Sequence, residues 1–548
     1  MAVGTECDIA RLPWAMTGFS DIRQQGNIYV DKTALIYELA RQRGPFFLSR
    51  PRRFGKSLLV DTLHSLFSRG LEDFRGLAID GLWQDRTYRV VRIDFSRMAD
   101  KEPREFEKSL RNRILYEFGI RDKNIALDIT GECRPPEEIT GIIADDLANN
   151  STVLLIDEYD APLTHHLDKP DELQSIVQIL NNFYATVKEY TSKFRFIFIT
   201  GITRIAHISI FSAFNNLDDI SFYHEYNSLL GFTKDELVLY FDDYIVNAAK
   251  ILGMSKKDVY VHLEQVYDGF QFAIDAKETL FNPWSILKFL KRPGDGFQNY
   301  WYQSGGISSL LVNYLKVRDN FDFLNIEDRS IITDKSQLEG RYELSAVPRE
   351  ILLCQAGYLT VRNCDGELRL VPPNGEVEAS LLYLYMTANN RTPQIALGTQ
   401  LKTLVGRIDG HDITGIVDVF NATLNYVVSP LSKVFTDERA VRDTLFGSLQ
   451  QVLHLQLFKE RESLDGYCDM EMLTPKTRLI VEFKRTYPKG EKGKKPRDAK
   501  TSLAEAVAQI ESHHYGESPF SVQTLFRVAM VISTEEKRIL PEYCREVR

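Results

Sequence analysis

The 548-residue sequence predicts an α/β protein, because short apolar runs alternate with amphipathic helical stretches from about residue 45 onward. Four runs have the length and apolar character of buried strands, and helical segments near 103–119, 137–148 and 171–190 stand between them. A strand followed by a helix, several times over, is typical of a parallel sheet with helices on its faces. The four predicted strands cover residues 46–48, 90–95, 153–156 and 196–200.

The pattern changes after about residue 215, and we place a second boundary near residue 375. The expected domains are therefore 1–215, 216–375 and 376–548. The middle domain is mostly helical and predicts a helical lid or winged-helix-like connector. Its amphipathic segments lie at 236–244, 257–266 and 283–290.

Two hairpins are expected in the second half of the chain. Asp365-Gly366 is a turn signal between apolar triplets at 359–361 and 368–370. In the last domain, helices lead into a second hairpin at 467–484, which a helix at 501–513 follows.

Composition excludes several classes of protein. With 44% hydrophobic and 26% charged residues the chain can bury several cores, and no run of eighteen apolar residues predicts a membrane span. A formal charge of -9 argues against a protein that coats nucleic acid nonspecifically. Six cysteines without a CxxC pair indicate reduced thiols, and Glu6 and Asp8 argue against a secretory signal. We expect a soluble, cytoplasmic protein that does not bind a membrane.

A segment typical of phosphate-binding loops follows the first predicted strand. It reads Arg50-Pro-Arg-Arg-Phe-Gly-Lys-Ser57 and opens a helix, which is the context that the GxxxxGK[ST] pattern requires. In that pattern backbone amides surround the phosphates, the lysine reaches the β and γ oxygens, and the hydroxyl binds Mg²⁺. Gly55, Lys56 and Ser57 can take those roles. Arg50 replaces the first glycine of the pattern, and the alternative interpretation is a basic helix N-terminus.

The run Val153-Leu-Leu-Ile-Asp-Glu158 predicts an apolar strand that ends in two adjacent carboxylates. A buried parallel strand delivers Asp157 to the carboxyl edge of the sheet, where it can hold magnesium through water, and Glu158 can polarise the attacking water. This is the Walker B arrangement. The alternative is a buried strand that ends at a turn with solvated acids.

A third strand end is expected at the same edge. Phe196-Ile-Phe-Ile-Thr200 continues into Gly201-Ile-Thr-Arg204. Because the ends of parallel strands converge, Thr200 or Thr203 can sense the γ-phosphate and Arg204 can read the nucleotide state. For Arg204 the alternative is a solvated loop residue or a structural ion pair.

A second group of charged residues lies in the predicted hairpin near the C-terminus. Gly466-Tyr-Cys-Asp469 is followed, after a turn at 474–477, by Leu479-Ile-Val-Glu482-Phe-Lys484. Residues two apart in a strand share a face, so Glu482 and Lys484 project together and meet Asp469 across the hairpin. Two such carboxylates can hold one or two Mg²⁺ ions, and the lysine can orient or activate the water that attacks phosphorus. The alternative is a hairpin with a cross-strand salt bridge.

Three neighbouring features bear on this group. A helix at 502–513 carries Gln509, with Tyr515 beyond it, and a preceding helix carries Glu438 on the same stripe as several apolar residues. Glu438 can face the site, or it can serve the first turn of its helix through the macrodipole. A basic stretch directly after the second strand can hold a phosphodiester backbone or can be a solvated loop. It contains Lys489, Lys492, Lys494, Lys495, Arg497 and Lys500.

Taken together, these motifs resemble the AAA-ATPase-like family, including its degenerate phosphate-binding loop. Tyr267-Asp-Gly-Phe270, Asn282-Pro-Trp284 and Gly357-Tyr-Leu359 are similar to the connector of that family, and residues from about 430 resemble its C-terminal PD-(D/E)xK nuclease domain. The N-terminal resemblance rests on Phe19-Ser-Asp-Ile-Arg23, Tyr29-Val-Asp-Lys-Thr33, the segment from Arg50 to Ser57, Leu155-Ile-Asp-Glu-Tyr-Asp160 and Gly201-Ile-Thr-Arg204.

The resemblance implies a P-loop NTPase sheet joined by the connector to a restriction-endonuclease-like α/β domain. It implies ATP as the nucleotide, with Mg²⁺, at Gly55, Lys56, Ser57, Asp157 and Glu158. Related ATPases often complete their sites between subunits, so a homo-oligomer is among the expectations.

For the C-terminal domain the resemblance implies a nuclease site formed by Asp469, Glu482, Lys484 and Gln509. We expect its substrate to be nucleic acid, in particular DNA. One departure concerns the first acid, because family members carry a Glu…Tyr-His element on the leading helix. This chain reads Ala440-Val-Arg-Asp443 in that register.

The leading hypothesis is therefore an ATPase that controls a metal-dependent nuclease. A second hypothesis is a nucleotide-switched module that binds nucleic acid or a protein and has an inactive nuclease-like domain. A third is a degenerate ATPase retained as a scaffold, which the replacement at Arg50 favours.

Overall fold

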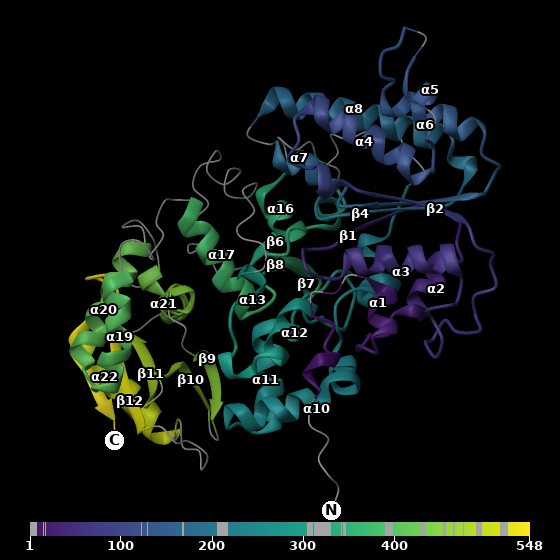
Figure 1. Cartoon of the computed structure of the whole chain (residues 1–548). Helices are drawn as coiled ribbons and strands as arrows, with labels where there is room; N and C mark the ends of the chain where they lie inside the picture. The colour runs from purple at the N-terminus through teal and green to yellow at the C-terminus, as the bar shows by residue number, and fades with distance from the viewer. Residues whose placement is uncertain are drawn as a thin grey trace, which may run out of the picture. The chain divides into compact units, whose positions relative to one another are not determined.

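The chain forms two compact units, each assembled from three stretches of sequence. The first unit contains residues 1–242, 268–287 and 331–373, and the second contains 243–267, 288–330 and 374–548. The computed structural model (Figure 1) describes residues 8–14, 16, 18–121, 123–128, 130–166, 169–204, 217–303, 311, 330–340, 342, 347–388, 398–428, 434–452, 456–463, 466–474, 476–488, 496–513, 515 and 524–547.

The first unit is built on a five-stranded parallel sheet with the order β2-β3-β4-β1-β5. The two central strands β3 and β4 are buried along their whole length, as their apolar sequences predict. All four predicted strands are confirmed. The strands are β1 Gly44–Ser49, β2 Arg89–Asp94, β3 Thr152–Asp157, β4 Phe194–Gly201 and the short β5 Asp218–Asp219.

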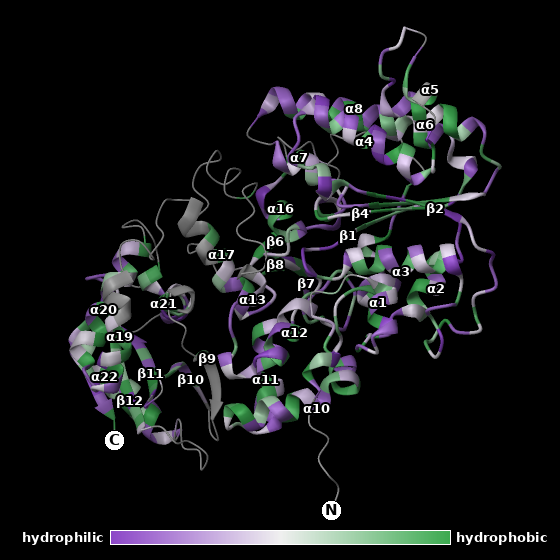
Figure 2. Cartoon of the chain, viewed as in Figure 1, coloured by the Kyte–Doolittle hydropathy of each residue, from purple (hydrophilic) through white to green (hydrophobic). Residues whose placement is uncertain are grey.

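Helices cover both faces of this sheet (Figure 1). Pro103, Pro136 and Pro170 each begin a helix of one layer, where the missing N–H of proline costs no hydrogen bond. Figure 2 shows hydrophobic and hydrophilic residues interspersed along these helices, as expected when one face is buried. That layer comprises α4 Pro103–Glu117, α6 Pro136–Asp145 and α8 Pro170–Glu189, and the other comprises α1 Phe19–Gln24, α2 Thr33–Ala40 and α3 Lys56–Arg69.

A small antiparallel sheet completes the first unit, in the order β6-β8-β7. Asp365 and Gly366 have φ values of 52° and 91°, so both lie in the left-handed region that a tight hairpin turn requires. The predicted hairpin is confirmed. The strands are β6 Ile331–Thr333, β7 Thr360–Cys364 and β8 Glu367–Val371. The described α-helices of the predicted connector are α10 Lys234–Leu252, α11 Lys256–Tyr267, α12 Pro283–Lys291, α13 Tyr300–Gln303, α15 Lys335–Leu338 and α16 Arg349–Gln355. Of these, α11 and α13 belong to the second unit, and α10 and α12 are divided between the units.

The second unit contains a mixed sheet with the order β13-β12-β11-β10-β9. The strands β9, β10 and β11 form an antiparallel meander, and helix α22 then crosses to β12, which lies parallel to β11. The predicted hairpin and the predicted helix after it are confirmed. The elements are β9 Gln456–Ser463, β10 Gly466–Leu473, β11 Thr477–Arg485, α22 Ala499–Ser512, β12 Thr524–Ser533 and β13 Arg538–Val547.

The two faces of the mixed sheet carry separate apolar cores. Val481 and Phe483 of β11 belong to the core formed with helices α19, α20 and α21, whereas Ile480 belongs to the core under α22. This alternation follows the two-residue period of a strand. It leaves Glu482 and Lys484 off the face that Val481 and Phe483 share. The helices are α17 Gly375–Ala388, α19 Gly398–Asp409, α20 Ile413–Val427 and α21 Glu438–Val452.

Within the described residues, no helix combines the length and the apolar character that crossing a membrane would require. The described cysteines are free thiols, at positions 133, 354, 364, 468 and 544.

Gly269 offers a test of the packing in the first unit. Its φ is 94°, and a methyl group on its Cα would overlap the carbonyl oxygen of Pro373. Gly366 has nearly the same φ of 91° but open space around it. We expect Gly269→Ala to lower the free energy of unfolding by about 2–4 kcal/mol and Gly366→Ala by about 1 kcal/mol, measured by urea denaturation. Equal losses in the two variants would contradict this packing.

Candidate functional site

The loop between β1 and α3 has the conformation of a phosphate-binding loop at its helix end. Gly55 is left-handed, with a φ of 98°, and α3 begins at Lys56. The Nζ of Lys56 donates to the carbonyl oxygens of Arg50 and Pro51, at 2.9 and 3.0 Å. Burial lowers the pKa of Lys56, and the charges of Glu158 and Asp157 oppose that shift. The ammonium group is therefore buried inside the loop, close to two carboxylates.

Arg50, the residue that departs from the usual pattern, anchors the loop. Its guanidinium donates to the carbonyl oxygens of Ser221 and Tyr226, at 2.7 and 2.9 Å, and lies 4.2 Å from the ring centroid of Phe272. Burial lowers the pKa of Arg50 to about 9. The side chain is thus held by backbone carbonyls of the 221–226 segment, while its own carbonyl accepts from Lys56.

The end of β3 brings Asp157 to the first turn of α3. Burial raises the pKa of Asp157, which a hydrogen bond from Ser57 and the charge of Lys56 oppose. The Oδ1 atom of Asp157 is buried and has no well-formed hydrogen bond among the described residues. A buried carboxylate oxygen beside a hydroxyl fits the oxygen-ligand preference of Mg²⁺.

Glu158 follows in a left-handed conformation, with a φ of 50° that is uncommon for a residue with a side chain. Burial raises the pKa of Glu158, and the charge of Lys56 acts in the opposite direction. The structure therefore brings together the residues predicted from the two strand ends, with the lysine between the carboxylates and the loop.

Asp160 is a site residue that the sequence reasoning did not single out. Its carboxylate accepts from the backbone N–H and the hydroxyl of Thr203, at 2.7 and 2.6 Å, and from the N–H of Ile202 at 3.1 Å. It joins the ends of β3 and β4. The sequence signal that could have identified Asp160 is its position as the third acid of Ile-Asp-Glu-Tyr-Asp160.

The side chains expected to sense the nucleotide already have protein partners. The hydroxyl of Thr200 donates to the carbonyl oxygen of Leu48 at 2.7 Å. The guanidinium of Arg204 lies 2.5 Å from the Asp219 carboxylate and donates to the carbonyl oxygen of Leu338 at 2.9 Å. These contacts match the structural alternative for Arg204, so its nucleotide-reading role stays a prediction.

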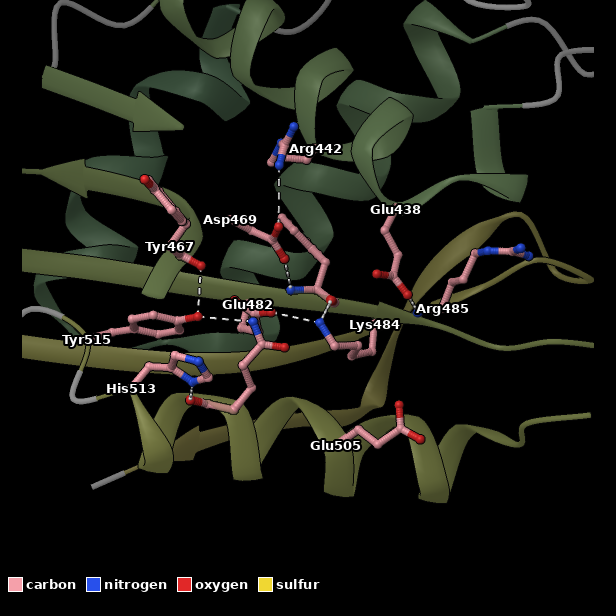
Figure 3. Close-up of polar contacts among 12 residues, drawn as sticks. Glu438, Arg442, Tyr467, Asp469, Glu482, Lys484, Arg485, Glu505, His513 and Tyr515 are labelled. Carbon is pink, nitrogen blue, oxygen red and sulfur yellow. Dashed lines mark hydrogen bonds and ion pairs between the residues drawn. The ribbon is translucent and has the colours of Figure 1, made fainter. Parts of the chain in front are cut away.

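In the second unit, Asp469, Glu482 and Lys484 gather on the β10–β11 hairpin (Figure 3). The Oδ2 of Asp469 accepts from the backbone N–H of Phe483 at 2.7 Å, which ties it to the neighbouring strand. The Nζ of Lys484 donates to Oε1 of Glu482 at 2.7 Å. Asp469, Glu482 and Lys484 therefore form one group that hydrogen bonds hold together on the hairpin.

The electrostatics of this group are dominated by burial. Glu482 is 1% exposed, and burial together with the charge of Asp469 raises its pKa to about 8. Burial also raises the pKa of Asp469. Burial opposes the charged form of Lys484, but the carboxylate of Glu482 outweighs it and raises the pKa of this lysine. Oε2 of Glu482 is buried without a well-formed hydrogen bond among the described residues, so the donor set fits a divalent cation.

Arg442 is a further member that the sequence reasoning missed as a site residue. It projects from α21, lies 2.8 Å from the carboxylate of Asp443 and places its Nη1 atom 3.4 Å from Oδ1 of Asp469 (Figure 3). The departure at Ala440-Val-Arg-Asp443 therefore puts a guanidinium next to a predicted metal ligand.

Glu438 faces the end of β11, four residues before Arg442 on the same helix. Its Oε1 accepts from the backbone N–H of Arg485 at 2.8 Å and from Arg497 at 3.0 Å. The carboxylate of Glu438 is close enough to interact electrostatically with both Asp469 and Lys484. The role of Glu438 as the first acid of the site stays a prediction.

Gln509 flanks the group through Tyr515. Its Nε2 donates to the Tyr515 hydroxyl at 3.0 Å, and that hydroxyl donates to the carbonyl oxygen of Tyr467 at 2.7 Å. Burial raises the pKa of Tyr515 to about 12. Of the basic stretch, only Arg497 and Lys500 are among the described residues, and Lys489, Lys492, Lys494 and Lys495 lie outside them.

Comparisons with known proteins agree with this division. A family described as predicted AAA-ATPase matches residues 13–211, and one described as PD-(D/E)XK nuclease superfamily matches residues 436–542. An uncharacterized protein in the vnfD 5' region of Azotobacter chroococcum mcd 1 is 31% identical over 491 residues, which are 86% of this chain and 89% of that protein. The Walker-type ATPase PABY2304 of Pyrococcus abyssi is similar over 63% of this chain and 93% of its own, at 13% identity and a TM-score of 0.29, too low to carry an argument.

The carboxyl pair predicts pH-dependent binding of a divalent ion. Because the pKa of Glu482 is raised from 4.5 to about 8, the metal-free carboxyl is protonated below that pH and must lose its proton to bind a cation. Affinity for Ca²⁺ should therefore rise about tenfold or more between about pH 6.5 and about pH 9.

Isothermal titration calorimetry of an Asp157→Asn chain, which lacks a ligand of the other candidate site, measures this dependence. Glu482→Gln in the same background is the control, and its remaining affinity should change less with pH. Equal Ca²⁺ affinities at both pH values in the Asp157→Asn chain would contradict the assignment.

Proposed function

The chain belongs to the AAA-ATPase-like family, and we propose that it hydrolyses ATP and thereby controls a Mg²⁺-dependent nuclease that cuts DNA. The observation that carries the proposal is the hairpin group of Asp469, Glu482 and Lys484, in which a buried carboxylate oxygen has no hydrogen bond from any residue that the structure describes. We place the protein in the cytoplasm, in line with its free thiols.

In the ATPase unit, each residue of the loop has a distinct proposed role. Backbone amides near Gly55 and the ammonium of Lys56 would bind the phosphates. Ser57 and Asp157 would hold Mg²⁺, which would neutralise charge on the phosphate oxygens. Glu158 lies at the end of the same strand and orients the attacking water. Burial raises the pKa of Glu158, which makes this carboxylate a better proton acceptor.

In the nuclease unit, Asp469 and Glu482 would hold the metal ion. When bound, such an ion polarises the phosphate and lowers the pKa of a coordinated water. Lys484 donates a hydrogen bond to Glu482 beside the candidate metal ligands, so its proposed task is to orient the water and stabilise negative charge. The hydrogen bond from Phe483 holds Asp469 in place for this task.

Control of one unit by the other is supported by the path of the chain. The backbone passes between the two units five times, at 242/243, 267/268, 287/288, 330/331 and 373/374. A change in the ATPase unit therefore has several covalent routes to the nuclease unit. We propose that nucleotide binding rearranges the connector and so controls access to Asp469 and Glu482, in a monomer or in a homo-oligomer.

A second candidate function is favoured by one observation. Arg442 places a positive charge 3.4 Å from Asp469, where it competes with a metal ion. The alternative is thus a nucleotide-switched module that binds nucleic acid without cutting it. Binding that is unaffected by chelator, with no cleavage in any nucleotide state, would favour this alternative.

Substitutions on the hairpin test the nuclease. Asp469→Asn and Lys484→Ala should each slow Mg²⁺-dependent cleavage of DNA by about 100-fold or more, because each removes a group that acts on the reacting phosphate. Cleavage is followed on labelled DNA, with RNA of the same sequence beside it. Lys476→Ala removes an exposed lysine just before the same strand and should cut normally. Unchanged cleavage in both site variants would remove the nuclease assignment.

Substitution of the loop lysine tests the ATPase separately. Lys56→Ala should reduce ATP hydrolysis by about 100-fold, measured as released phosphate, since the phosphates lose their buried positive partner. If nucleotide state controls the nuclease, this variant should also cut DNA at the same rate with and without ATP. Cleavage by Lys56→Ala that still responds to ATP would contradict the coupling.

A further inference from the structure

Two of the four tryptophans in the chain meet beside the phosphate-binding loop, and the proposed chemistry uses neither. The ring centroids of Trp14 and Trp284 are 4.4 Å apart, with their planes inclined by 42°. The guanidinium of Arg53, a loop residue, lies 4.3 Å from the centroid of the Trp284 ring. Both tryptophans are half-buried, so each retains some accessible surface.

Trp284 lies in the first turn of α12, where Asn282 accepts a hydrogen bond from its backbone N–H at 3.0 Å. Other loop residues pack against Phe272, which precedes α12 in the chain. Phe54 packs edge-on against Phe272, with ring centroids 5.1 Å apart, and the guanidinium of Arg50 lies over the same ring at 4.2 Å. From the loop, Arg53 contacts the indole itself.

Arg53 connects the aromatic pair with the place where phosphates are expected. It lies two residues before Gly55, in a left-handed conformation with a φ of 68°. It is also within electrostatic reach of Glu158, the acid at the end of β3. Arg53 thus lies next to the candidate phosphate site, and it connects that site with the two indoles.

This combination of groups selects a particular class of ligand. Aromatic faces and a planar guanidinium bind flat π systems by stacking, and the loop binds phosphate. A nucleoside triphosphate carries both features at its two ends. The structural alternative is that the two indoles only fasten the N-terminal segment to α12.

We propose that Trp14 and Trp284 form the nucleobase subsite of the nucleotide site, an inference that rests on the proposed ATP-binding function. The base stacks on the indole face that the guanidinium of Arg53 covers in this structure, and Arg53 turns toward the phosphates. Stacking contacts the face of a base and not the edge that distinguishes adenine from guanine. ATP and GTP should therefore bind with similar affinity.

The experiment compares a ligand with a base and one without. Isothermal titration calorimetry of the full chain measures the affinity for Mg²⁺-ATP and for Mg²⁺-tripolyphosphate. Trp284→Ala and Trp14→Ala should each weaken ATP binding about tenfold, as expected for the loss of a stacked base, and leave tripolyphosphate binding within about twofold. Trp284→Phe keeps an aromatic face and should recover most of the affinity for ATP.

Tripolyphosphate binding also reports whether each variant is folded, and Lys56→Ala, which should lose both ligands, identifies the loop. Unchanged ATP affinity in both tryptophan variants would overturn the subsite. Equal loss of both ligands would also overturn it, because that result indicates a structural role. A wild-type chain that binds neither ligand would instead refute the ATP-binding function, and the subsite with it.

Discussion

Burial of ionised side chains at the ends of strands is the constraint on which both candidate sites depend. Asp157 and Glu482 are almost fully buried, where a carboxylate is costly unless cations and hydrogen bonds compensate it. Lys56 supplies the positive charge in the first site and Lys484 in the second. In each site one carboxylate oxygen remains without a well-formed hydrogen bond among the described residues. In each site this oxygen is a ligand that a bound metal ion can use.

Buried arginines hold loops in place at both edges of the parallel sheet, with Arg50 and Arg204 at the edge that carries the candidate site and Arg195 at the opposite edge. Arg50 and Arg204 donate to backbone carbonyls of segments that lack a strand partner, and Arg195 donates to the carbonyl of Ala40 at 3.0 Å as well as pairing with Asp85 at 2.9 Å. A guanidinium suits this task, because its five donors can satisfy several carbonyls at once. The replacement of a loop glycine by Arg50 thus has a structural explanation, and it leaves the helix end of the loop unchanged.

In the second unit, the two-residue period of β11 separates the apolar side chains of the core from the charged side chains of the candidate site. Val481 and Phe483 are buried in one core, while the intervening Glu482 and the following Lys484 form the charged group. A shift of one residue in the pairing with β10 would exchange these sets and bury the wrong side chains. The register of the β10–β11 pairing therefore determines both the stability of the hairpin and the geometry of the site.

Local patterns in the sequence determined four strands of the parallel sheet, the phosphate-binding loop, the Asp365-Gly366 hairpin and the hairpin that carries Asp469, Glu482 and Lys484. Each depends on strand period, turn conformation or helix start, which act over a few residues and can be read without the rest of the chain. Tertiary structure alone decided the partners of Arg442 and Arg204 and the meeting of Trp14 with Trp284. Those contacts join residues far apart in sequence, and which distant side chain neutralises or stacks on another depends on how whole elements pack.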